Sequence, residues 1–233
     1  MLDGASALKG FKLHCLDGEL GSVMTFYFDD RYWTIRYVVA NTGDWIEGRQ
    51  VLISPHALTA VSRERHHISV NLTRKQIESS PSLDSAEPIS RRFEESYHRY
   101  FGWPRYWGAP FTWGSTPYIA RNDEEQRVEA SGEQASDPHL RSSNAVTGYH
   151  VAAKDGEIGH VVDFLIDDEA WAIRYLVVDT RNWWPGKQVM IAPKWIECLS
   201  VDQSKAFVAL SRDQVKQSPA YAPGELPRQV DDR

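Results

Sequence analysis

The chain has 233 residues, a net charge of −6, and 42% hydrophobic and 25% charged residues, the proportions of an ordinary globular protein. Its acidic balance counts against a nucleic-acid binder, because phosphate binding needs a basic surface. Two cysteines and the lack of a long apolar run predict a cytoplasmic protein with neither a disulfide framework nor a membrane span.

One stretch of sequence occurs twice. The pattern Asp-Asp-x-x-Trp-x-Ile-Arg-Tyr begins at Asp29 and again at Asp167. Extending the match without gaps aligns residues 10–81 with residues 148–219, and about 28 of about 72 paired positions are identical. A repeat of this kind indicates a duplicated domain, so we predict two small domains rather than one large domain.

Both copies predict the same series of short strands. Asp17-Gly18 is a dipeptide typical of tight turns, and Gly21 indicates a bulge or bend just inside the following strand. Later strands, one of them over residues 50–53, and a terminal helical turn complete about six strands. We therefore expect a mainly β fold of two tandem, small, antiparallel β-barrels.

The strand after the acidic turn alternates clearly. The face that we expect to line the core comprises Trp33, Ile35, Tyr37 and Val39, and all four residues are identical in the second copy. Arg36 and its counterpart Arg174 fall on the opposite face. We predict that these two arginines lie on the surface, where they pair with a turn aspartate or contact a partner.

An aromatic-rich segment separates the repeats. Ile89, Phe93 and Tyr97 fall at helical spacing, with Ser90 as a candidate N-cap and Gly102 as a stop signal. This segment either packs on the barrels as additional core or forms a docking surface. The predicted division of the chain is a first barrel (1–82), an aromatic helix-loop connector (83–118), a flexible polar linker (119–147), a second barrel (148–220) and a disordered tail (221–233).

The order of turn, glycine, acidic turn and aromatic–aliphatic strand resembles the PRC-barrel domain family. That family is named after the cytoplasmic part of the H chain of bacterial photosynthetic reaction centres, and it also supplies the C-terminal domain of a bacterial 16S rRNA maturation factor. The resemblance covers about 144 of the 233 residues and implies a protein-docking module. The chain shows neither the transmembrane helix of the H chain nor the separate N-terminal domain of the maturation factor, so neither role transfers with the fold.

One acidic pair and one histidine pair are candidates for metal binding or acid/base catalysis. Asp29-Asp30 could bind a divalent ion or act as an acid/base pair, but we favour a solvated turn because no further carboxylates stand at ligand spacing. His66-His67 could bind a metal, but adjacent strand residues point to opposite faces. We therefore assign no catalytic, cofactor-binding or metal-binding residue, and we expect no enzyme.

Our hypothesis is a non-enzymatic scaffold or adaptor that binds another protein, with the two barrels able to pack as an internal pseudo-dimer. The predicted partner-binding residues are Arg36, Arg174, Trp103, Tyr106 and Trp107, because arginine and aromatic residues dominate interface hot spots. A competing hypothesis is a ribosome-assembly or RNA-processing factor, although we expect no direct contact with nucleic acid. An electron-transfer accessory protein related to the H chain and a small-ligand-binding protein are two further hypotheses.

Overall fold

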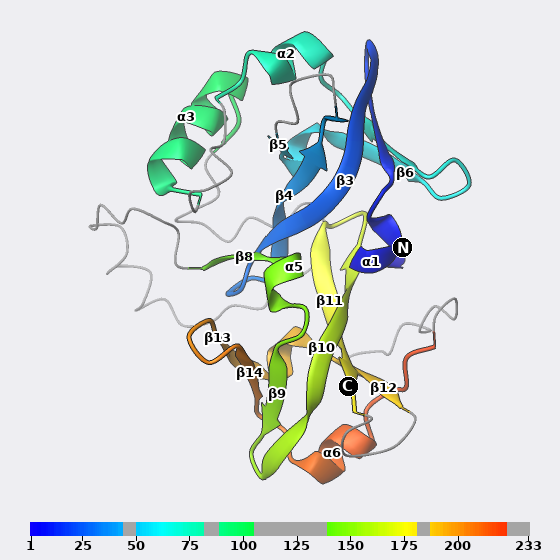
Figure 1. Cartoon of the computed structure of the whole chain (residues 1–233), viewed down its shortest axis with the longest axis vertical. Helices are drawn as coiled ribbons and strands as arrows, with labels where there is room; N and C mark the ends of the chain where they lie inside the picture. Colours follow the sequence, from blue (N-terminus) through cyan, green and yellow to red (C-terminus); the bar gives the residue numbers. More distant parts are fainter. Residues whose placement is uncertain (44–49, 82–88, 105–138, 181–186, 223–233) are drawn as a thin grey trace. The chain divides into compact units, whose positions relative to one another are not determined.

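The computed structural model describes residues 1–43, 50–81, 89–104, 139–180 and 187–222 (Figure 1). Strands predominate, so the predicted mainly β class is confirmed. Among the helices that the structure describes, none is long and apolar enough to cross a membrane.

The chain divides into two compact units, and each combines one sequence repeat with short segments from elsewhere. The first-repeat unit comprises residues 7–142 and 169–172. The second-repeat unit comprises residues 1–6, 143–168 and 173–233.

Seven strands and two helices form the described part of the first-repeat unit. The strands are β2 (Lys12–Cys15), β3 (Gly18–Asp29), β4 (Thr34–Asn41), β5 (Gln50–Ile53), β6 (Leu58–Ser62), β7 (His67–Val70) and β8 (Leu140–Ser142). The helices are α2 (Arg74–Glu78) and α3 (Arg91–Phe101), and a 3-10 turn, η2, spans Pro55–Ala57. The strands pair in the order β6-β7-β2-β3-β4-β5, and β8 lies on β3.

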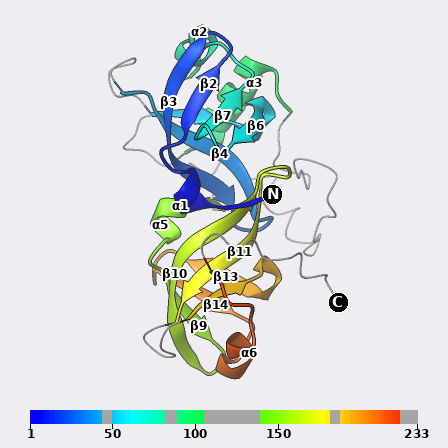
Figure 2. The same cartoon turned by 90° about the vertical axis from the view of Figure 1, so that its right-hand side faces the viewer.

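The second-repeat unit follows the same plan (Figure 2). Its strands are β1 (Leu2–Gly4), β9 (His150–Ala153), β10 (Gly156–Asp167), β11 (Ala172–Asp179), β12 (Gln188–Ile191), β13 (Ile196–Ser200) and β14 (Lys205–Val208). Its short helices are α5 (Ser143–Val146) and α6 (Arg212–Lys216), and the 3-10 turn η3 spans Pro193–Trp195. The helix α1 (Ala5–Leu8) starts in this unit.

The two repeats exchange their leading strands. β1 precedes the first repeat but pairs with β10, whereas β8 precedes the second repeat and pairs with β3. Leu2 and Leu140 occupy equivalent repeat positions. The strand that precedes each repeat in the sequence therefore pairs with a strand of the other repeat. The acidic turn secures β8, since the Asp30 carboxylate lies 2.8 Å from both His139 Nδ1 and Arg141 Nε.

Neither unit forms the closed antiparallel barrel that we predicted. β2 pairs parallel to β7, and β9 pairs parallel to β14, so the strand pairing in both units is mixed. Among the described strands, no ladder joins β5 to β6 or β12 to β13. The predicted bulge at Gly21 is present, because the β2–β3 register shifts there and a Cβ at Gly21 would lie 2.1 Å from the Asn41 carbonyl oxygen.

The prediction that one face of β4 meets solvent is wrong. Every residue from Thr34 to Ala40 is buried, and Arg36 is 1% exposed. The Arg36 guanidinium lies 3.2 Å from the Asp29 carboxylate, and this ion pair offsets the cost of placing a charge inside the protein. The alternation had suggested a half-buried strand, but both faces of β4 are covered.

Candidate functional site

Each unit carries an equivalent apolar patch on one face of its own strands. In the first-repeat unit the patch, which we call the Tyr37 face, comprises Met24, Tyr27, Tyr37, Val39 and Leu52. In the second-repeat unit the patch, which we call the Tyr175 face, comprises Val162, Leu165, Tyr175, Val177 and Met190. Each member of one set has its repeat counterpart in the other, so the duplication preserved the whole face.

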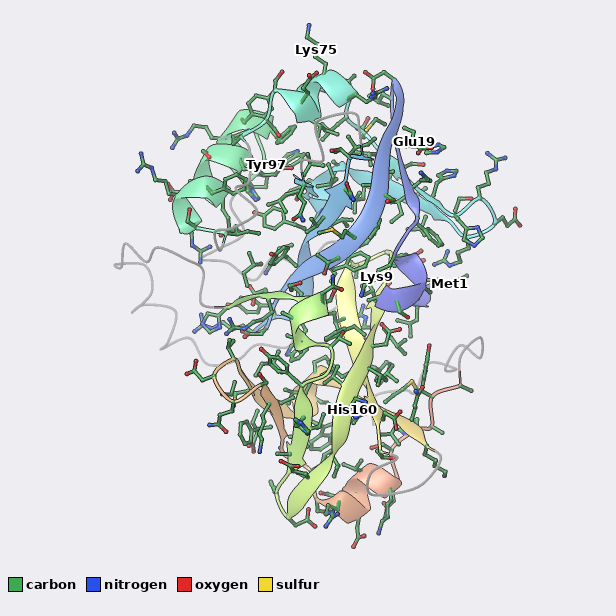
Figure 3. The ribbon with its side chains drawn as sticks, viewed as in Figure 1. Met1, Lys9, Glu19, Lys75, Tyr97 and His160 are labelled. Carbon is green, nitrogen blue, oxygen red and sulfur yellow. The ribbon has the colours of Figure 1, made fainter. Side chains whose placement is uncertain are left out.

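The helix α3 covers the Tyr37 face (Figure 1). Its predicted signals are confirmed: the Ser90 hydroxyl accepts a hydrogen bond from the Phe93 N–H, and Gly102 ends the helix with φ 71°. Phe93 and Tyr97 stand one helical turn apart and therefore point to the same side. Tyr97 projects towards the sheet (Figure 3), where it is 1% exposed and donates its hydroxyl proton to the Leu52 carbonyl.

A polar network lies within this apolar contact. The Tyr37 hydroxyl oxygen is 2.9 Å from Glu94 Oε1 and 3.0 Å from His98 Nε2. His98 Nδ1 is 2.9 Å from the Pro104 carbonyl oxygen, and Arg91 Nη1 is 3.4 Å from the second Glu94 oxygen. Tyr37, Glu94 and His98 are all at most 1% exposed, so the network joins the sheet to the helix without facing solvent.

The donors and acceptors of this network constrain its protons. A carbonyl oxygen has no proton to give, so His98 Nδ1 carries the hydrogen that points at Pro104. Nε2 of a neutral imidazole is then an acceptor that faces the Tyr37 hydroxyl group. The Tyr37 hydroxyl donates to Glu94 Oε1, and the Arg91 guanidinium pairs with the second oxygen of the Glu94 carboxylate.

Burial opposes a positive charge on His98. Burial is the main reason that the pKa of His98 falls from 6.5 to about 4. The hydrogen bond to the Pro104 carbonyl works in the opposite direction, whereas His56 and Arg36 lower the pKa further. The imidazole is therefore neutral at pH 7.

Among the described residues, the Tyr175 face has a different cover. An extended segment lies along β12, where Tyr221 N–H donates to the Gln188 carbonyl and Met190 N–H donates to the Pro219 carbonyl. Tyr221 contacts the face, and no helix does so among the described residues. Val162 and Tyr175 remain half-buried. Within the part of the chain that the structure describes, the Tyr175 hydroxyl makes no hydrogen bond.

The predicted partner-binding residues occupy different settings. Arg36 is buried, whereas the Arg174 side chain is 33% exposed and lies 2.7 Å from the Asp167 carboxylate. Trp103 is half-buried and stacks on Phe101 at 4.4 Å, at the edge of the α3 contact. Tyr106 and Trp107 lie outside the described residues.

The two residue pairs considered for metal binding have structural partners. Asp29 accepts hydrogen bonds from the turn amides of Arg31 and Tyr32 and also pairs with Arg36. The His66 ring packs edge-on against Phe11, whereas the His67 ring stacks on His14, so the neighbours diverge as predicted. Among the described side chains, no group of three or more His, Cys, Asp or Glu could hold a metal ion.

Sequence reasoning missed Glu94 and His98, because the aromatic residues around them dominate the pattern. The sequence did hold an indication of this network. Glu94 and His98 stand four positions apart on the predicted helix, and both lie next to Tyr97 on its apolar stripe. Polar residues placed within an apolar stripe point to a buried network rather than to a solvent face.

No protein-family model matches the chain, and a search of curated proteins also finds no match. Membership of the PRC-barrel family therefore remains a proposal.

The two equivalent tyrosines should respond differently to loss of their hydroxyl groups. We expect Tyr37→Phe to cost about 1–3 kcal/mol, because it leaves buried Glu94 and His98 groups without their shared partner. Tyr175→Phe should change stability by less than about 0.5 kcal/mol. Urea unfolding of both variants measures the difference, and equal losses would contradict the asymmetry.

Substitutions at Glu94 test its part in the network. Glu94→Gln should cost less than about 1 kcal/mol, because the amide oxygen still accepts the Tyr37 hydroxyl proton and only the ion pair with the partly exposed Arg91 is lost. Glu94→Ala should cost about 2 kcal/mol or more, through a lost partner and a cavity. Equal losses for Gln and Ala in urea unfolding would contradict a stabilising role for the hydrogen bond between Tyr37 and Glu94.

The pH dependence of stability follows from the lowered pKa of His98. The unfolded chain binds a proton near pH 6.5 and the folded chain only near pH 4, so the contribution of His98 is complete above pH 6.5 and is lost as the pH falls towards 4. Between pH 7 and pH 4.5, the wild type should lose about 2 kcal/mol more than His98→Gln does. Parallel pH curves for the two proteins, measured by urea unfolding, would exclude this role.

Proposed function

We propose that the chain is a non-enzymatic, cytoplasmic scaffold of the PRC-barrel type, which binds another protein through helix-receiving faces on its sheets. The observation that carries the proposal is α3 on the Tyr37 face, since it displays the kind of element that this face accommodates. The duplication supplies a second face with equivalent residues and without a helix among the described residues. Preserving an apolar face that is not fully covered is a feature of interaction surfaces.

The buried network supports a structural role rather than catalysis. Tyr37, Glu94 and His98 bond to one another beneath α3, where no substrate could approach them without displacement of the helix. Their interactions hold the helix on the sheet. The two cysteines are both free thiols, which fits a reducing compartment.

Affinity purification of the tagged chain from its native host, followed by crosslinking mass spectrometry, tests the proposal. We expect a protein to be enriched well above a tag-only control and to remain enriched after nuclease treatment. A partner that disappears with the nuclease would favour an RNA-processing factor instead. Recovery of no protein above the control would contradict the scaffold function.

A further inference from the structure

We propose that His14 and His67 together bind one divalent transition-metal ion that prefers imidazole ligands, such as Zn²⁺ or Cu²⁺. The sequence pointed to His66 as the neighbour of His67, whereas the fold places the His14 ring against it instead. The site lies within the first-repeat unit and does not depend on the scaffold function.

The parallel pairing of β2 and β7 places the two histidines together. Leu13 lies opposite Ile68 in this pair, and both side chains are fully buried on the core face. His14 follows Leu13 and His67 precedes Ile68, so both histidines point to the opposite face. The His14 side chain is 49% exposed there, and His67 is half-buried. The core therefore fixes the backbone beneath two imidazoles that solvent can reach.

The two imidazole rings are in contact and have ligand atoms that no other group uses. Their centroids are 4.4 Å apart, and their planes differ by 2°. Among the described residues, no group forms a hydrogen bond with a ring nitrogen of either histidine, since the Glu19 carboxylate lies 3.9 Å from His14 Nε2. A neutral imidazole binds a metal through the nitrogen that carries no hydrogen. The pair therefore presents two metal ligands.

Rotation of the rings brings both nitrogens within reach of one ion. Zn–N bonds are about 2.0–2.1 Å long, so two nitrogens on a tetrahedral ion lie about 3.4 Å apart. The ring separation is close to that spacing, and the broad torsion about the Cβ–Cγ bond of histidine lets the parallel planes tilt towards a common point. No group of three or more His, Cys, Asp or Glu forms a site among the described side chains, so water completes the coordination.

The ligand type restricts the metal. Imidazole nitrogens suit Zn²⁺, Cu²⁺ and Ni²⁺, whereas Mg²⁺ and Ca²⁺ prefer oxygen ligands. A site built from two histidines and water should therefore bind Zn²⁺ and leave Mg²⁺ unbound.

The fold does not require the histidine pair. The second repeat has Ala152 and Lys205 at the equivalent positions, yet β9 and β14 pair in the same parallel register. The Lys205 ammonium lies 2.8 Å from the Glu157 carboxylate. In the first-repeat unit, Lys12 makes the equivalent contact with Glu19, also at 2.8 Å. Both units therefore have the same surface ion pair, and the two imidazoles are an additional feature of the first repeat.

Isothermal titration calorimetry of the full-length chain with zinc chloride tests the site. We expect saturable binding of one Zn²⁺ ion per chain and no saturable binding of Mg²⁺ from magnesium chloride. His14→Ala and His67→Lys should each weaken Zn²⁺ binding at least about tenfold, because each removes a ligand. The second repeat carries these same residue types at the equivalent positions, so the fold should accept both substitutions. His150→Ala, which removes an exposed histidine from β9, is the matched control and should leave binding unchanged.

Paramagnetic broadening by Cu²⁺ locates the ion in the wild-type chain. In two-dimensional amide NMR spectra, substoichiometric Cu²⁺ should first broaden the signals of β2 and β7, while those of β9 and β14 stay sharp. Absence of saturable Zn²⁺ binding would overturn the inference, and so would binding that His14→Ala and His67→Lys do not weaken. Broadening centred on another histidine or on the N-terminal amine would also contradict it.

Discussion

The hydroxyl group of Tyr37 imposes the constraint on which the first-repeat unit depends. A buried phenol must keep its hydrogen bonds, since a lost partner costs about 1–3 kcal/mol. Glu94 and His98 supply those partners, and both come from α3. The helix is therefore held by a specific polar contact as well as by apolar burial, which explains why acidic and imidazole side chains occur within its aromatic stripe.

The duplication preserved the sheet face but not its cover. Five positions on each face are equivalent, yet one face lies beneath α3 and the other contacts only the extended segment at Tyr221 among the described residues. The exchange of leading strands shows that the repeats also depend on each other's sequence, because β8 completes the sheet of the first repeat and β1 that of the second. Among the described residues, one repeat thus has a helix on its face and the other has an extended segment.

Local patterns predicted most of the elements correctly. The repeat, the bulge at Gly21 and the boundaries of α3 at Ser90 and Gly102 depend on residue type over short stretches, so the sequence alone contains them. The sequence did not predict the strand exchange, because residues 2–4 and 140–142 have only their leucine in common. The pairing of Arg36 with a turn aspartate was predicted, but its burial was not, because strand periodicity does not show that the second face of β4 is also covered.

Chemical modification of tyrosine, read by mass spectrometry, tests the central claim that one of two equivalent faces is covered by α3. Tyr37 and Tyr175 occupy matched positions in matched strands, so any difference in their reactivity reports the cover rather than the strand. Nitration of the native chain should modify Tyr175 much faster than Tyr37. Equal rates at the two residues would show that the faces are covered alike and would contradict the account.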